Sequence, residues 1–172
     1  MDFFTVPTIT MRVLFVFMVL EHGRRKFVHF NVTEHPTAAW TAQQIREAFA
    51  DREPAQYAIR DRDGVYGNLV HECITSLGME EVLSAPQSPW QNPYSERLVG
   101  TIRRDCLNHF VIFNARHLRR TLALYFRYYH ASRTHLGLAK QCPFAREISR
   151  TGRILEIPHI GGLHHRYERL AA

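Results

Sequence analysis

Cysteine is scarce in this sequence, and the few cysteines form no motif. The 172 residues include three, Cys73, Cys106 and Cys142, and none of them belongs to a Cys-x-x-Cys pair. This pattern excludes a cysteine-based zinc knuckle and a disulfide framework, and it favours a reducing compartment.

Long hydrophobic runs are missing as well. The longest, Val13–Leu20, has eight residues, whereas a membrane-spanning helix needs about 20. A signal peptide is not expected, because Asp2 lies where such a peptide is basic and Glu21-His22 replaces the small residues of a cleavage site. We therefore expect a cytoplasmic protein with no membrane partner.

The composition is that of an ordinary globular domain. It is 45% hydrophobic and 22% charged, which excludes a disordered polymer and a collagen. A chain of 172 residues is long enough to bury one hydrophobic core without disulfides.

Acidic residues are rare in the second half of the chain. Residues 97–172 hold 14 Lys and Arg against 4 Asp and Glu, a balance of +10, whereas residues 1–96 hold 8 against 12, a balance of −4. Thirteen of those 14 are Arg, whose guanidinium pairs with phosphate oxygens and stacks on bases. The asymmetry favours a nucleic acid partner; a basic surface that aids only solubility is the alternative.

Apolar runs bounded by turn residues predict the strands. The run within Arg12–Leu20 is apolar on both faces, which is typical of a central strand covered by helices on both sides. The predicted strands are Asp2–Val6, Arg12–Leu20, Lys26–Val32, Tyr57–Arg60 and Glu81–Ala85.

Helices are predicted over residues 37–49, 68–77, from Asn92-Pro93 to about 109, and over 116–130. Asn92 is a typical cap and Pro93 a typical first helical residue. Three antiparallel strands followed by alternating helices and strands predict an α/β fold with a mixed sheet flanked by helices. Residues beyond about 147 have weak periodicity, and we expect them to be poorly ordered.

Three carboxylates fall at the ends of predicted elements that can meet at one edge of this sheet. Asp2 begins the first strand, Asp61 follows the fourth, and Glu96 lies in the first turn of the third helix. Clustered carboxylates repel unless protonated or bridged by cations, and an oxygen-only ligand set favours Mg²⁺ or Mn²⁺. Two such ions could activate an oxygen nucleophile and stabilise the leaving oxygen of a phosphodiester. For each acid taken singly, the alternative is a solvated surface group or a cap.

Four motifs, in order, resemble those of insertion-sequence transposases and retroviral-type integrases. Residues 61–66 resemble the Asp-Arg-Gly-Ser-Gln-Tyr stretch around the family's second catalytic Asp, and residues 88–96 resemble the loop and helix start that carry its catalytic Glu. Residues 128–143 resemble the closing Tyr-Asn … Arg … His … Leu … Pro signature, and residues 2–5 match the first-strand Asp.

The resemblance implies an integrase-type catalytic core with a ribonuclease H-like fold over residues 1–145, followed by a basic tail over residues 146–172. It implies that Asp2, Asp61 and Glu96 are catalytic and hold two Mg²⁺ or Mn²⁺ ions. The implied reaction is phosphoryl transfer in DNA integration and transposition, in which water cuts a DNA end and the freed 3′-hydroxyl attacks target DNA. A homo-oligomer is also implied.

The second acid is open between Asp61 and Asp63. Aligning Tyr66 with the family's Tyr favours Asp61, which leaves 34 residues before Glu96, close to the family's usual thirty-five, whereas Asp63 leaves 32. We prefer Asp61 and interpret Asp63 as a turn residue or a residue behind the ligands.

Basic residues on the last two predicted helices and beyond are candidates for contact with DNA. At 100° per residue, Glu96, Gly100 and Arg103 share one helix face. An amphipathic helix with a solvated basic face is the alternative. The candidate DNA-binding residues are Arg103, Arg104, Arg116, Arg120, Arg127, Arg133 and His135.

The sequence departs from the family at its start. Related transposases usually carry a helix-turn-helix region ahead of the core, whereas this chain begins one residue before Asp2, so we expect its first strand to be shortened at the N-terminal end. Three functions stay open: a magnesium-dependent transposase or integrase core, a non-catalytic DNA-binding remnant, and a related nuclease that cuts without strand transfer.

Overall fold

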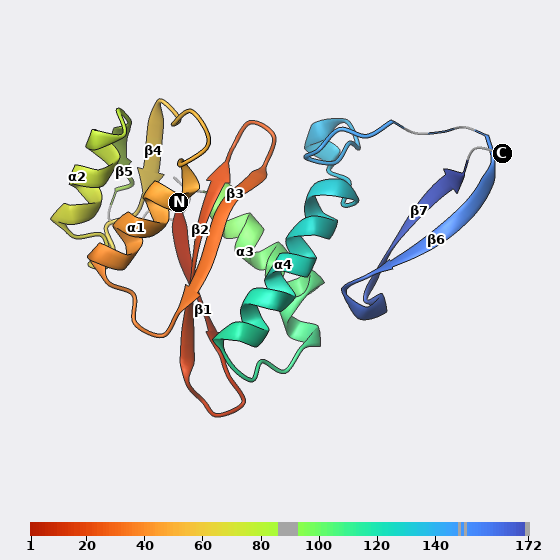
Figure 1. The fold of residues 1–172 in the computed structure, drawn as a ribbon, viewed down its shortest axis with the longest axis horizontal. Helices are drawn as coiled ribbons and strands as arrows, with labels where there is room; N and C mark the ends of the chain where they lie inside the picture. The colour runs from red at the N-terminus through yellow and green to blue at the C-terminus, as the bar shows by residue number, and fades with distance from the viewer. Residues whose placement is uncertain (86–92, 148, 150, 171–172) are drawn as a thin grey trace.

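The computed structural model describes residues 1–85, 93–147, 149 and 151–170 (Figure 1). Short 3-10 turns connect some of the elements, and the loop at residues 86–91 and the Asn92 cap that we predicted lie outside the described residues. In chain order the elements are β1 (Asp2–Pro7), β2 (Val13–Glu21), β3 (Lys26–Thr33), α1 (Ala38–Ala48), β4 (Tyr57–Arg60), α2 (Asn68–Ser76), β5 (Glu80–Leu83), α3 (Pro93–Asp105), α4 (Ala115–Ala131), β6 (Arg153–His159) and β7 (His164–Leu170).

The first three strands form an antiparallel sheet with β2 in the centre. The ladder between β1 and β2 starts at the pair Asp2 and Met18, so β1 is paired from its first residue. Aromatic and β-branched residues fill β2, and these residue types suit a pleated surface that packs on both faces. The predicted antiparallel arrangement of these strands is confirmed.

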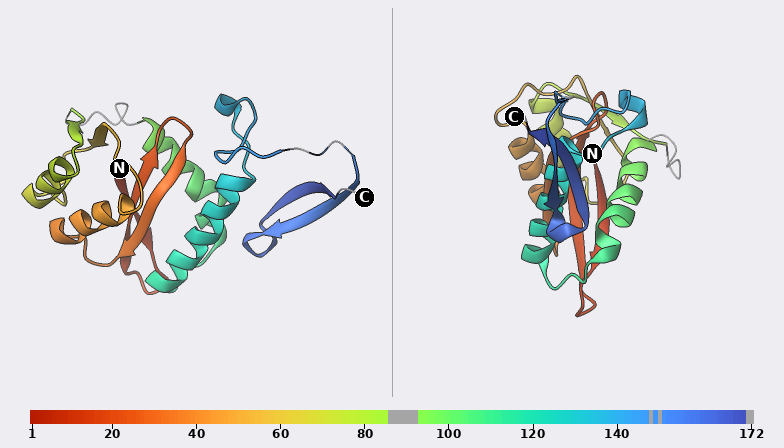
Figure 2. Two further views of the ribbon diagram at one scale, coloured as in Figure 1. Left: turned by 45° about the horizontal axis from the view of Figure 1, so that its top comes forward. Right: turned by 90° about the vertical axis from the view of Figure 1, so that its right-hand side faces the viewer.

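The two faces of β2 pack into two different hydrophobic cores. Leu14, Val16 and Met18 belong to the core shared with α3 and α4, whereas Phe17 and Val19 belong to the core shared with α1 and α2. Alternate residues of a strand point to opposite faces, so one run of apolar residues supplies both cores. Figure 2 shows the helices on the two sides of the sheet, and the predicted central strand is confirmed.

The predicted single mixed sheet is only partly found. Strands β4 and β5 form a separate parallel ladder, from the pair Tyr57 and Glu80 to the pair Arg60 and Leu83. One hydrogen bond links this ladder to the larger sheet, in which the Met1 amine donates to the Ile59 carbonyl at 2.7 Å. The physical reason for the split is that, within the described part of the chain, the residue before β1 contacts β4 through this amine rather than through a run of paired residues.

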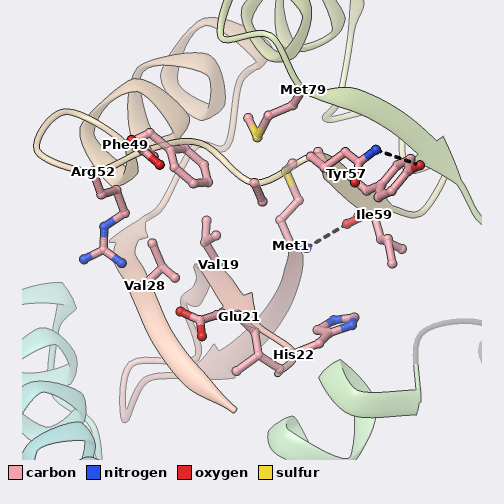
Figure 3. Close-up of a pocket in the computed structure, with 15 residues that line it drawn as sticks. Met1, Val19, Glu21, His22, Val28, Phe49, Arg52, Tyr57, Ile59 and Met79 are labelled. Carbon is pink, nitrogen blue, oxygen red and sulfur yellow. Dashed lines mark hydrogen bonds between the residues drawn. The ribbon is translucent and has the colours of Figure 1, made fainter. Parts of the chain in front are cut away.

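A cavity of about 520 Å³ opens behind Met1, between β2 and β4 (Figure 3). Val19 and Val28 line one side, and Phe49 and Met79 line another. None of Asp2, Asp61 and Glu96 lines this cavity. It therefore lies beside the start of β1 without being part of the carboxylate site predicted from the sequence.

Helix α3 ends earlier than we predicted. It stops at Asp105 rather than near residue 109, because Cys106 leaves the helical conformation (φ −139°, ψ −70°) and the chain enters the short turn Leu107–His109. The buried face of α3 carries Leu98 and Ile102, as the helical spacing predicts. This face anchors the helix whose first turn bears Glu96.

The expectation that the tail is poorly ordered was wrong. Strands β6 and β7 form an antiparallel hairpin beside α4. Gly161 and Gly162 both have positive φ values, which let the chain reverse at the tip. The tip is held on α4: Ile160 is buried in the core, and the His164 ring stacks on Tyr128 at 4.5 Å between centroids.

Among the residues that the structure describes, we find no helix with the length and apolar character needed to cross a bilayer.

Acid should destabilise the contact between β3 and α4. The His130 ring accepts a hydrogen bond at Nε2 from the Phe27 amide at 2.8 Å, and burial, with a smaller effect of Lys26, lowers the pKa of His130 to about 4. The unfolded chain, with an ordinary value of 6.5, therefore binds more protons between about pH 4 and 6.5. The free energy of unfolding should consequently fall as the pH decreases through this window.

Chemical denaturation at several pH values checks this expectation. His130→Gln should make the slope between about pH 4 and 6.5 smaller than in the wild type, whereas His35→Gln, which changes an exposed histidine, should keep the wild-type slope. Equal slopes for His130→Gln and the wild type would contradict the assignment.

Candidate active site

Asp2 lies at the start of β1, where the sheet approaches β4. Its Oδ1 accepts a hydrogen bond from the Phe3 amide at 2.8 Å. The pKa of Asp2 is raised to about 6, chiefly by burial and with smaller contributions from the negative charges of Asp61 and Glu96, against opposing effects of the Phe3 amide and the terminal amine. The surroundings of Asp2 therefore disfavour the ionised form of its carboxyl group.

Asp61 follows β4 in a loop that two arginines hold in place. The guanidinium of Arg60 is buried, and it donates to Glu81 at 2.6 Å and to the carbonyl oxygen of Asp61 at 2.9 Å. Arg62 donates to the Ser84 carbonyl at 3.1 Å. These contacts tie the start of the loop to β5 and to the residue that follows it, so the ladder sets the position of Asp61.

Asp63 serves the local turn. Its Oδ1 accepts a hydrogen bond from the Val65 amide at 3.2 Å, and its carbonyl oxygen accepts one from the Tyr66 amide at 3.0 Å. The side chain of Asp61 accepts a longer contact, 3.3 Å, from the Asp63 amide. The charge of Asp61 acts on Asp2, whereas no such effect of Asp63 on Asp2 is found.

Glu96 is exposed in the first turn of α3. The start of this helix is fixed by Ser95 and Leu98, which are buried, and by a contact with the turn between β2 and β3. There the rings of Tyr94 and His22 lie 5.0 Å apart. A carboxylate at the positive end of a helix is favoured electrostatically.

The three candidate acids therefore approach one another without forming a compact ligand group. Both Asp61 and Glu96 act on the carboxyl group of Asp2. Within residues 1–85, 93–147, 149 and 151–170, however, no three His, Cys, Asp or Glu side chains are arranged closely enough to hold a metal ion.

Tyr66 provides a test of whether a hydrated cation fits here. Its side chain is 5% exposed, and its hydroxyl is buried without a hydrogen-bond partner among the described residues. Burial, followed by the charges of Asp2, Asp61 and Asp63, raises its pKa. A buried hydroxyl without a partner is costly, and a water molecule bound to a cation beside these carboxylates could donate to its oxygen. The chemistry of these oxygen donors therefore suits Mg²⁺ or Mn²⁺, although the described side chains form no compact ligand group.

The predicted DNA-binding arginines of α3 and α4 are exposed. Arg103 donates to the Thr5 carbonyl at 3.0 Å and so covers β1. Arg116, Arg120 and Arg127 face solvent on α4, opposite the buried Leu118, Leu122 and Tyr125. Arg104 is exposed near the end of α3. Their contact with DNA stays a prediction.

The two predicted DNA-binding residues after α4 have structural partners. Arg133 forms an ion pair with Asp105 at 2.7 Å, and both side chains are about a quarter exposed. His135 is buried, with its ring edge against Tyr129 at 4.9 Å. Their role in DNA binding also stays a prediction.

Residues 77–143 match the family model described as integrase core domain. This segment is therefore similar to an integrase core domain. The match includes Glu96 but neither Asp2 nor Asp61. No curated protein matches the chain.

Two solved structures are similar in fold to this chain. One is a chain of the simian T-cell lymphotropic virus intasome in complex with PP2A regulatory subunit B56 gamma, with a TM-score of 0.70 and 12% identity. The alignment covers 96% of our chain but 64% of that chain. The other is the catalytic core domain of BIV integrase, with a TM-score of 0.55, 14% identity, and coverage of 83% and 89%.

Sequence reasoning missed several side chains around this site. It used Tyr66 to align a motif but did not identify its buried hydroxyl, and it did not single out His22, Tyr94, Arg25 or Arg97. The contacts of His22 and Arg25 with Tyr94 join the turn after β2 to α3. Nothing in the local pattern signals a contact over that distance in the chain.

Arg133 and Arg116 should respond differently to substitution. Arg133→Gln removes a charged hydrogen bond from Asp105, and we expect the free energy of unfolding to fall by about 1 kcal/mol, since the pair is partly solvated. Arg116→Gln changes an exposed side chain and should leave stability unchanged. Thermal unfolding of both variants measures this; an equal effect in both would contradict the structural role of Arg133.

Proposed function

We propose that this chain is the catalytic core of a DNA transposase or integrase, a divalent-metal-dependent polynucleotidyl transferase. The observation that carries the proposal is the position of Asp2: its carboxyl group is partly buried at the start of β1, and the charges of Asp61 and Glu96 both act on it. The integrase core match over residues 77–143 supports the same reaction class.

Asp2, Asp61 and Glu96 are the residues that would hold the metal, which we take to be two Mg²⁺ or Mn²⁺ ions. Bound there, the ions would supply Lewis-acid stabilisation of the attacking and leaving oxygens of a phosphodiester. Asp61 suits this role better than Asp63, because Asp63 is used in its own turn and Asp61 is the one whose charge reaches Asp2.

The chain's own residues would keep these acids in place. Arg60 fixes the loop of Asp61 through its bond to that residue's carbonyl oxygen, and the Phe3 amide holds one oxygen of Asp2. The hydroxyl of Tyr66 is available to donate a hydrogen bond at the inner side of the site. Repulsion among the acids keeps them apart, and we expect the side chains to close on the cations.

DNA is the proposed partner, both as element ends and as target. The exposed arginines of α3 and α4 provide positive charge for the phosphate backbone. The similar intasome chain comes from a DNA-integrating assembly by its name, and we propose that this chain also acts as a homo-oligomer.

A non-catalytic DNA-binding protein is the second candidate. The observation in its favour is that the described residues contain no compact set of metal ligands. In this case the fold and the arginine surface would serve binding alone.

The activity test uses the 172-residue chain, Mg²⁺ or Mn²⁺, and a labelled duplex that copies an element end. We expect both nicked and joined products. Asp61→Asn and Glu96→Gln should each reduce cutting by about 1,000-fold or more, because each removes a charge that holds the metal.

Asp63→Asn is the matched control, since it changes a neighbouring acid used in the turn, and it should keep most of the activity. Loss of cutting in Asp63→Asn but not in Asp61→Asn would contradict our choice of the second acid. Nicked products without joining would indicate a nuclease, and a salt-sensitive gel shift without cutting would indicate the non-catalytic alternative.

A further inference from the structure

A small cavity of about 110 Å³ lies between three parts of the chain that the proposed catalysis does not use. The turn between β2 and β3 contributes Arg25, helix α3 contributes Arg97 and Thr101, and the segment after α4 contributes Arg133 and His135. Arg97 directly follows Glu96 in α3, so the cavity adjoins the candidate active site.

The cavity is lined by positive charge. Three of its residues are arginines, and none of the described residues that line it is an acid. Asp105 pairs with Arg133 from outside the lining set, which leaves the charges of Arg25 and Arg97 without a carboxylate in the cavity. Three guanidinium groups around one small space favour an anion with several oxygens.

His135 adds an uncharged donor at the inner side. The residue is 7% exposed, and its Nδ1 lies 3.4 Å from Nη1 of Arg133, a group that can only donate. Nδ1 is therefore the acceptor and Nε2 carries the hydrogen. Among the described residues, Nε2 is buried and has no partner, so an N–H donor of a residue that lines the cavity lacks an acceptor.

The walls of the cavity are held in place. Arg24 donates to the Pro143 carbonyl at 2.9 Å, which attaches the turn after β2 to the segment after α4. The guanidinium of Arg25 lies 6.0 Å from the Tyr94 ring centroid and so close to Gly137 that a side chain there would collide with it. Preorganised donors of this kind lose little entropy when an anion binds.

We propose that this cavity binds one phosphate group of the DNA backbone, through Arg25, Arg97, Arg133 and the Nε2–H of His135. Burial, followed by the charges of Arg133 and Arg25, lowers the pKa of His135 to about 4, which supports a neutral ring that donates through Nε2. The proposal rests on the proposed function for its choice of DNA as the source of the phosphate. A strand held here would pass beside Glu96.

The test measures duplex DNA binding by the full chain over a series of salt concentrations. Arg25→Gln and Arg97→Gln should each weaken binding by about 10-fold and lower the slope of log affinity against log salt by about 1. Because both arginines contact the same phosphate, the double variant should also lose about 1 in slope, rather than 2. Arg12→Gln, at an exposed position on the turn before β2, is the control and should match the wild type.

A titration with inorganic phosphate, followed by NMR of the His135 imidazole, tests the cavity without DNA. We expect the Nε2–H signal to shift in the wild type and the shift to need at least 10-fold more phosphate in Arg97→Gln. Suppose that the wild type binds and cuts DNA. If the single variants then keep the wild-type slope of log affinity against log salt, or if the double variant lowers that slope by 2, the phosphate site is wrong and the proposed function stands. If the wild type neither binds nor cuts DNA, the proposed function is wrong, and the phosphate titration alone supports or overturns the anion site.

Discussion

The mutual repulsion of carboxylates around Asp2 is the constraint on which the structure of this site depends. A partly buried carboxyl group with two further acids nearby is unfavourable as a charged group, so the fold must hold it there by other means. It does so through β2, which pairs with β1 from Asp2 onward and packs into both hydrophobic cores. The stability of the two cores thus keeps the acids together, and a bound cation would turn the repulsion into attraction.

Much of the fold could be predicted because its signals are local. Short stretches of sequence carry the apolar run of β2, the alternating residues of β4 and the apolar stripes of α3 and α4. Strand β4, for example, has the predicted bounds Tyr57–Arg60. The split of the sheet was missed, because it depends on how far β1 extends toward Ile59. The hairpin of β6 and β7 was missed since its docking depends on Tyr128 of α4.

In the candidate site, too, local motifs could be predicted from the sequence and long-range contacts could not. The order of motifs predicted three acids, and the charges of Asp61 and Glu96 act on the pKa of Asp2. The described residues form no compact ligand group, so the catalytic role of these acids stays a prediction. The charge balance said less about DNA binding, because it cannot distinguish arginines that form hydrogen bonds within the protein from those that face solvent. Arg119 and Arg120, for example, are both exposed, but Arg119 donates to Asn31 at 2.9 Å. Long-range partners decide this difference, and they are not visible in the sequence.

The most direct test of the central claim is a crystal structure of the chain grown with Mn²⁺ and measured at the manganese absorption edge. The account predicts anomalous peaks bound by carboxylate oxygens of Asp2 and Asp61, with Glu96 drawn toward them. Ordered manganese at other positions, with these three carboxylates free of metal at saturating Mn²⁺, would contradict it.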